Sequence, residues 1–132
     1  MGASDYLEGK ILDDIFGIAA FSVPGTVYIA LYTAAPSDTG GGTECSGNAY
    51  ARVAVTNTAA SWSRTGNQVT NDNAITFPTP TGPAWGTVTH WGMFDAASAG
   101  NLLMWGALTT SRATAAGTAP NFPAGDLQTN LD

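Results

Sequence analysis

The stretch VTHWGMFDAASAGNLLMWGAL, Val88–Leu108, decides the fold because it contains two apolar, strand-like runs joined by a short loop. The runs extend over residues 85–94 and 102–110, and both contain the aromatic and β-branched residues that favour strands. The loop between them offers a glycine and an asparagine, which tolerate the positive φ angles of hairpin turns. We therefore expect a β-hairpin at the centre of the core.

His90, the only histidine of the chain, lies in this hairpin beside Trp91 and close to Asp95. Successive side chains of a strand point to opposite faces, so His90 and Trp91 should not share a site. Asp95 follows the strand, where a carboxylate commonly accepts backbone N–H bonds of a turn. We expect a sheet histidine and a turn aspartate, with a catalytic or metal-binding site as the alternative. Strand parity places Trp85, Thr87, Thr89, Trp91 and Met93 on one face and Gly86, Val88, His90, Gly92 and Phe94 on the other.

Further strand-like runs lie on both sides of the hairpin, separated by breaks rich in glycine and proline. In TVYIALYT, Thr26–Thr33, the residues Val27, Ile29 and Leu31 share one face. The other runs are YARVAVT (50–56), SWSRT (61–65), QVTN (68–71), AITF (74–77) and DLQTNLD (126–132). This spacing predicts a mainly β fold: an antiparallel β-sandwich or jelly-roll-like barrel of about six to eight short strands.

One amphipathic α-helix is predicted ahead of the strands, over Asp5–Phe16. Asp5 is the expected N-cap, with Glu8 three residues later in a capping-box arrangement, and Gly17 is the expected stop. A helix of about three turns is marginal alone, so its apolar stripe must pack on the domain or on a neighbour. The stripe consists of Leu7, Ile11, Leu12, Ile15 and Phe16.

The 132 residues are expected to form a single domain. Residues 1–17 would form the helix and docking arm, and residues 24–132 the β-sandwich, with a Gly-rich loop over 34–49. Cys45, the only cysteine, lies in this loop and excludes an internal disulfide; we expect an exposed free thiol. Asp38 and Glu44 flank the glycines of the loop, where solvated carboxylates are expected and a weak calcium site is the alternative.

The charge balance argues against two classes of partner. Charged residues make up only 11% of the chain, and four basic residues against ten acidic ones give a net charge of −6. Nucleic-acid binding uses clustered Lys and Arg, whereas here the basic residues are isolated, so neither nucleic acid nor an anionic membrane is expected as a partner. No run approaches the ~20 apolar residues of a membrane span, and the first residues do not form a signal peptide.

No sequence motif predicts a catalytic residue, a cofactor site or a metal site. The nucleophile motif G-x-S-x-G and the phosphate-binding loop are both absent. The tryptophans are the best candidates for ligand contact, since exposed indoles can stack on sugars, but core packing is the commoner outcome. They are Trp62, Trp85, Trp91 and Trp105.

Several blocks of the sequence together resemble a known family. They are SDYLEGKILDDIFG, TVYIALYTAAPSD, YARVAVT, AITFPTPTG, WGTVTHWGMFDAASAGNLLMWGALTT and AGDLQTNLD. The chain is similar over nearly its whole length to small tailed-bacteriophage virion proteins, usually labelled tail-fibre-like. The segment Ser111–Pro123 matches least, which leaves the order of the last strands open. The resemblance implies a non-enzymatic structural component of the virion, assembled in the cytoplasm of the host bacterium.

Within that family resemblance, a capsid decoration (cement) protein is the first hypothesis, because a fibre shaft needs repeats or length. A tail or tail-fibre component is the alternative, followed by a glycan-binding receptor-recognition module. The expected partners are the major capsid protein or other virion structural proteins, and a homo-oligomer, trimer or dimer, is expected. The residues predicted to lie at the protein interface are Leu7, Ile11, Leu12, Ile15, Phe16, Asp38 and Glu44.

Overall fold

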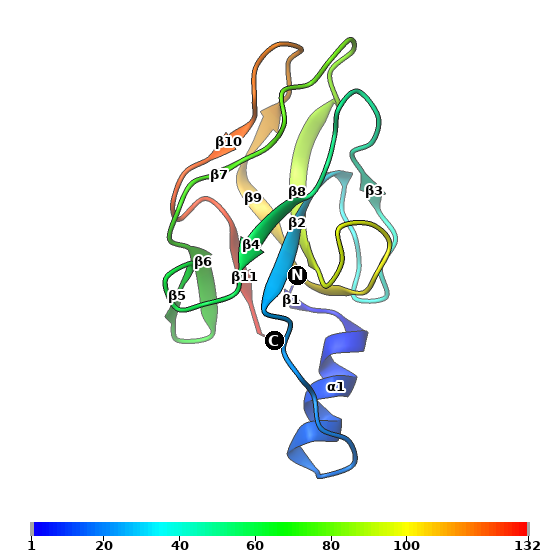
Figure 1. Ribbon diagram of the computed structural model, residues 1–132, viewed down its shortest axis with the longest axis vertical. Coiled ribbons are helices and arrows are strands. Elements are labelled where there is room, and N and C mark those ends of the chain that lie inside the picture. The colour runs from blue at the N-terminus through cyan, green and yellow to red at the C-terminus, as the bar shows by residue number, and fades with distance from the viewer. Residues whose placement is uncertain (1, 132) are drawn as a thin grey trace.

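The computed structural model describes residues 2–131 and shows a β-rich body from which one helix projects (Figure 1). The strands are β1 (Gly2–Ala3), β2 (Thr26–Ala34), β3 (Thr43–Glu44), β4 (Val53–Thr56), β5 (Trp62–Thr65), β6 (Gln68–Asn71), β7 (Ile75–Thr76), β8 (Thr87–Phe94), β9 (Leu102–Ala113), β10 (Asn121–Phe122) and β11 (Gln128–Asn130). The helix is α1 (Asp5–Ile15). The mainly β prediction with one N-terminal helix is confirmed, although the described strands do not close into a barrel.

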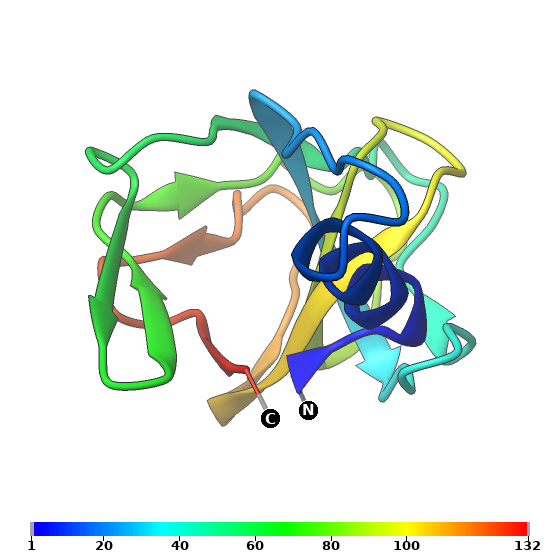
Figure 2. The same ribbon diagram turned by 90° about the horizontal axis from the view of Figure 1, so that it is seen from below.

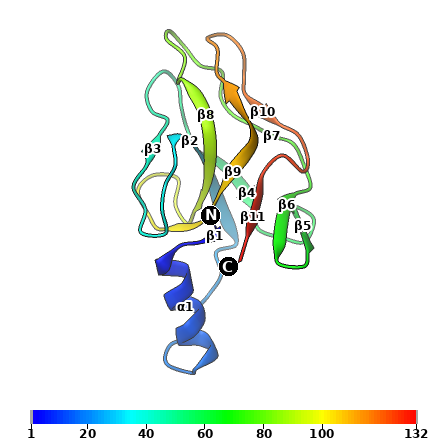
Figure 3. The same cartoon turned by 180° about the vertical axis from the view of Figure 1, so that it is seen from behind.

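The main sheet is built around the predicted hairpin. Its strands run in the order β1–β9–β8–β2, and β2 pairs along its length first with β4 and then with β3. Every pairing is antiparallel, and Trp91 of β8 lies opposite Gly106 of β9. Figure 3 shows β8 and β9 side by side as the longest curved strands of this sheet. The hairpin prediction is therefore confirmed.

Two small sheets complete the body: β5–β6–β11 and β7–β10. The segment 111–123, for which no strand was predicted, contains the end of β9 and all of β10. The strand count exceeds the predicted six to eight because β1, β3 and β10, of two residues each, lie outside every predicted run. Such short pairings are set by tertiary contacts and leave no periodicity in the sequence.

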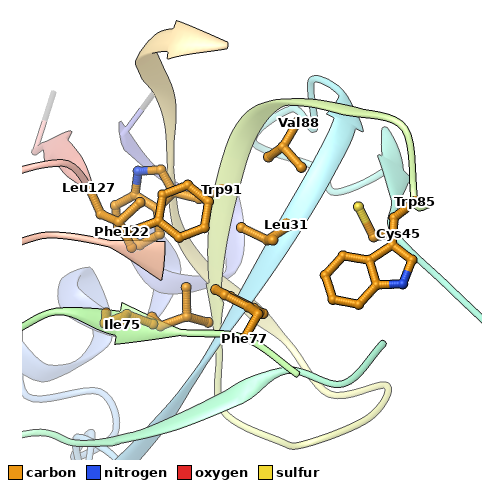
Figure 4. Packing of buried hydrophobic residues seen from close by; sticks show 10 residues of the cluster. Leu31, Cys45, Ile75, Phe77, Trp85, Val88, Trp91, Phe122 and Leu127 are labelled. Atoms are coloured by element: carbon orange, nitrogen blue, oxygen red, sulfur yellow. The ribbon is translucent and has the colours of Figure 1, made fainter. Parts of the chain in front are cut away.

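The core lies between the main sheet and the smaller strands (Figure 4). From the main sheet come Ile29, Leu31, Val88 and Trp91, and from the opposite side Ile75, Phe77, Phe122 and Leu127. A second, smaller cluster on the other face of the main sheet contains Ala30, Tyr32, Phe94 and Leu102. The predicted alternation of β2 is thus confirmed.

Two predictions about this core are wrong. Val88 shares the core with Trp91 and lies on the face opposite to that of His90, because the β8–β9 register shifts between Val88 and His90 and interrupts the alternation. Cys45 is buried at 4% exposure, not exposed. Its backbone N–H donates to the Leu31 carbonyl at 2.9 Å, which continues the pairing of β3 with β2 and holds this part of the Gly-rich loop against the body.

Trp91 fastens the C-terminal strand to the main sheet. Its indole Nε1 donates to the Gln128 carbonyl at 3.1 Å. The contact requires Gly106, since a Cβ there would lie 2.1 Å from that same carbonyl oxygen and 2.9 Å from Trp91 Nε1. The backbone of β11 therefore packs directly against β9.

We predict that Gly106→Ala lowers the free energy of unfolding by roughly 1–3 kcal/mol, because the added methyl must displace β11 or the indole. Urea titration followed by tryptophan fluorescence measures the change. Gly25→Ala is the matched control, since a Cβ at Gly25 meets nothing within 4 Å. Equal stability of the two variants would show that β11 does not depend on this close approach.

Candidate protein-docking site

The start of α1 is fixed to the main sheet. Ser4 is buried, its Oγ accepts the Leu7 N–H at 3.1 Å, and the same hydroxyl donates to the Leu102 carbonyl at 2.5 Å. Ser4, not Asp5, is therefore the N-cap, so the predicted cap is wrong by one residue. The Asp5 N–H instead donates to the Asp38 carbonyl at 2.9 Å. These bonds orient the helix away from the body.

The other end of α1 is exposed and apolar. None of the eleven helical residues is buried, and Gly17, the predicted stop, follows the helix with a positive φ of 70°. Leu7 and Ile11 are half-buried and line a hollow of about 330 Å³ over the main sheet. Ile15 also lines this hollow but is largely exposed, as are Leu12 and Phe16. The domain therefore covers only the Leu7 and Ile11 part of the stripe, and packing of the rest on a neighbour stays a prediction. We call the exposed set the apolar tip: Leu12, Ile15, Phe16, Ile18 and Val23.

The apolar tip is part of a wider concentration of exposed apolar side chains. Among residues 2–131, the large hydrophobic side chains that are exposed all belong to α1, to the segment 16–23 or to the C-terminal end of the chain. Ile15, Phe16 and Ile18 are 68%, 73% and 74% exposed. A concentration of this kind on an otherwise polar protein marks an interaction surface.

A groove opens at the same end of the molecule, beside the helix. It has a volume of about 610 Å³ and lies between the β5–β6 hairpin and the methionines of β8 and β9. Figure 2, viewed from this end, shows α1 and the β5–β6 hairpin on opposite sides of β11. The lining residues are Asn57, Trp62, Arg64, Gly66, Asn67, Val69, Met93, Met104, Thr129 and Leu131.

The tip and the groove adjoin each other. Asn57, Met93 and Met104 line both the groove and the hollow beneath α1. The Trp62 Nε1 is shielded from solvent and has no hydrogen-bond partner within the described part of the chain. Sequence periodicity missed the groove, because its walls come from five strands, β5, β6, β8, β9 and β11. The apolar residues in FGIAAFSV (16–23), which follow neither a helical nor a strand period, were an available signal for the extended tip.

The two loop carboxylates predicted at the interface have partners within the chain. Glu44 forms a bidentate ion pair with Arg52, with Nε–Oε1 and Nη2–Oε2 distances of 2.8 and 2.9 Å. Asp38 Oδ1 accepts the Trp105 Nε1 at 3.0 Å. Both carboxylates therefore hold the Gly-rich loop in place. Contact of Leu7, Ile11, Leu12, Ile15, Phe16, Asp38 or Glu44 with another protein stays a prediction.

Arg52 also contacts the loop between β8 and β9. Its Nη1 donates to the Ala96 and Ala99 carbonyls at 2.9 and 2.8 Å, and its guanidinium stacks 3.6 Å from the centre of the Phe94 ring. The Arg52 side chain is only 8% exposed. The Gly-rich loop and the β8–β9 loop are thus linked by one guanidinium.

The histidine, the turn aspartate and two of the four tryptophans have partners or neighbours within the described part of the chain. His90 shares a hydrogen bond with Thr89, and partial burial lowers its pKa. Burial acts to raise the pKa of Asp95, but hydrogen bonds from the Asn101 side chain and N–H outweigh it and lower the pKa. Trp85 and Trp91 are buried, which removes them from any sugar-stacking platform.

Residues 2–131 contain no group of three or more His, Cys, Asp or Glu side chains arranged to hold a metal ion. Within the same range, no helix has both the length and the apolar character needed to span a membrane.

Comparison with known proteins defines the class of the chain as a phage virion structural protein. The match extends over residues 2–130 and is to the family described as podophage GP4 fiber I protein gp80, so the chain belongs to that family. Comparison with curated proteins gave no match. The resemblance to phage virion structural proteins is confirmed.

We predict that Arg52→Met lowers the free energy of unfolding by roughly 3 kcal/mol, because it leaves Glu44 partly buried without its cation. Thermal and urea unfolding measure the loss. Arg112→Met is the matched control: Arg112 pairs with Asp126, but both side chains are 37% exposed, so about 1 kcal/mol or less is expected. Similar losses in both variants would contradict a special role for Arg52.

We predict that Cys45 reacts slowly with a thiol reagent in the folded protein. Burial, and then the nearby Glu44 carboxylate, raises the pKa of the thiol to about 11, so only about one thousandth is thiolate at about pH 8. Labelling followed by mass spectrometry, with and without denaturant, gives the comparison. Rapid labelling of the native protein would show that the Gly-rich loop opens.

Proposed function

We propose that this chain is a non-enzymatic structural subunit of a podophage fibre, and that it assembles in the virion through the apolar tip and the groove. The clustering of exposed apolar side chains at one end of the molecule carries the proposal. Membership of a family described as a podophage fibre protein supports the placement in a fibre.

The energetics favour a covered tip. Burying one Leu, Ile, Phe or Val side chain contributes about 1.5–3 kcal/mol, so the five residues of the tip offer a substantial driving force for association. The cluster includes helix residues predicted from the sequence, Leu12, Ile15 and Phe16, and adds Ile18 and Val23. The body behind the tip is tied together by internal bonds, as at Ser4 and Arg52, so the tip is presented on a fixed support.

Capsid decoration is the second candidate. The compact body with one projecting helix supports it, because a chain without repeated units does not build a shaft by itself. In that arrangement the partner of the tip would be the major capsid protein. The two candidates agree on a structural role and differ in the place of the chain in the particle.

We predict that a cryo-EM map of a podophage virion carrying this protein places its β-body in a fibre at the tail. The check is a fit of the whole chain, with α1 and the β5–β6 hairpin as asymmetric landmarks that fix its orientation. Density for the chain on the capsid lattice would contradict the fibre proposal and favour decoration.

The amount of each variant incorporated into virions tests whether the apolar tip is used in assembly. Ile15→Asp with Phe16→Asp should fold but enter virions in reduced amount, because both side chains are exposed in the isolated chain. Ala115→Asp with Ala116→Asp, exposed in the loop between β9 and β10, is the matched control. Equal incorporation of both double variants would show that the tip is not used in assembly.

A further inference from the structure

A polar pocket lies where the first turn of α1, the Gly-rich loop and the β8–β9 loop meet, above α1 in Figure 1. We call it the loop pocket. Its volume is about 530 Å³, and Tyr32, Phe94 and Leu102 of the smaller apolar cluster contribute to its lining. It shares no lining residue with the groove or with the hollow beneath α1. The loop pocket is therefore separate from the surfaces to which the proposed function assigns assembly.

The walls of the loop pocket are held in place by bonds within the chain. The Asp5 N–H donates to the Asp38 carbonyl at 2.9 Å, which joins the start of α1 to the Gly-rich loop. The Arg52 guanidinium joins that loop to the β8–β9 loop through Glu44 and the Ala99 carbonyl. A ligand would enter a site that is already formed, which lowers the ordering cost of binding.

One buried hydroxyl in the loop pocket lacks a partner. Tyr32 is only 3% exposed and lines the pocket, yet its hydroxyl makes no hydrogen bond with any residue of the described range 2–131. A buried hydroxyl ordinarily has a partner, because leaving it unpaired costs free energy. Burial, and then the Glu44 carboxylate, raises the pKa of Tyr32 to about 12, although Arg52 acts to lower it. The hydroxyl therefore stays protonated and can both donate to a ligand and accept from it.

Two carboxylates of the loop pocket lack a counter-charge. Asp5 and Asp38 both line it, and neither forms an ion pair within the part of the chain that the structure describes. Asp38 Oδ1 accepts the Trp105 Nε1, which leaves Oδ2 free. Glu44, by contrast, is neutralised by Arg52. An anion would be repelled here, and a neutral ligand would desolvate both carboxylates without compensation, so the charge pattern favours a cation.

The shape and chemistry of the lining favour a guanidinium over an ammonium group. A guanidinium offers five donors in one plane, so it can bond to a carboxylate and a hydroxyl at once and stack on an aromatic ring. The Tyr6 ring lines the pocket and is 38% exposed, and Lys10 Nζ already lies 5.6 Å from its centre. The chain uses the same mode itself, since Arg52 pairs with Glu44 and stacks on Phe94.

We propose that the loop pocket binds an arginine side chain of a different virion protein, through Asp5, Asp38 and the Tyr32 hydroxyl. A different protein is the expected source because the arginines of this chain are already bonded within it: Arg52, Arg64 and Arg112. The inference goes beyond the proposed function, which assigns no role to this pocket. It also returns Asp38 to the interface at which the sequence placed it, with its free Oδ2 as the contacting atom.

Titration of the whole chain with a short peptide, acetyl-Gly-Arg-Gly-amide, tests the proposal. Two-dimensional NMR should show saturable shifts of amide signals from the first turn of α1 and the Gly-rich loop, with a dissociation constant of about 1 mM. The same peptide with citrulline, which has a similar shape but no charge, should bind about tenfold or more weakly. A lysine peptide should also bind more weakly, because its ammonium lacks the planar fork.

Variants of the pocket separate binding from folding. Asp5→Asn with Asp38→Asn should weaken binding about tenfold or more, while the new amide oxygen at residue 38 can still accept the Trp105 N–H. Asp72→Asn, an exposed change outside the pocket, is the matched control and should bind normally. Tyr32→Phe should weaken binding about fivefold without lowering the thermal midpoint, because the hydroxyl has no bond to lose in the folded chain.

Several results would overturn the proposal. They are the absence of saturable shifts, equal binding of the arginine and citrulline peptides, equal binding of the lysine peptide, and a lowered thermal midpoint of Tyr32→Phe. Shifts of the same amides by methyl α-D-glucopyranoside at lower concentrations than the peptide requires would assign the pocket to a neutral sugar instead. All of these measurements use the isolated chain, so they leave the fibre placement untouched, and the position of the chain in the virion leaves this binding test untouched.

Discussion

The contact between the Trp91 indole and the Gln128 carbonyl, made across Gly106, positions β11 against the main sheet and with it the small β5–β6–β11 sheet. Because residue 106 has no side chain, β11 lies against the main sheet, and the Thr129 hydroxyl adds a bond to the Trp105 carbonyl at 2.7 Å. β11 pairs with β6, and β6 pairs with β5. The groove exists because these strands are held at this place beside β8 and β9.

The sequence predicted the parts of the fold that depend on local periodicity. The alternation of Val27, Ile29 and Leu31 placed β2, and the Gly- and Asn-containing loop placed the β8–β9 hairpin. The sequence-based prediction failed where an irregularity interrupts the alternation of side chains along a strand. The register shift between Val88 and His90 is such a place, and it puts Val88 on the core face. The prediction also failed for two-residue strands such as β10, whose existence depends on a partner far away in the chain.

The candidate site shows the same division. The apolar stripe of the helix was visible from its spacing, but which half would be buried depended on the Ser4 anchor, and a hydroxyl bond to Leu102 across 98 residues has no local signal. Asp38 looked like a free loop carboxylate because its partner Trp105 is distant in sequence, and Glu44 because no regular element of the predicted loop places Arg52 beside it. The groove could not be predicted, since its walls belong to strands whose pairing was unknown.

The attachment of α1 at both of its ends has a mechanical consequence. The chain enters the helix from β1 and Ser4 and leaves it toward β2, and β1 and β2 belong to the same sheet (Figure 1). Traction on the helix is therefore shared between two strands and, along β2, acts nearly parallel to the strand. Under such shear the β2–β8 hydrogen bonds must yield together, whereas peeling would break them one by one. A particle that pulls on this end of the subunit would load the sheet in its most resistant direction.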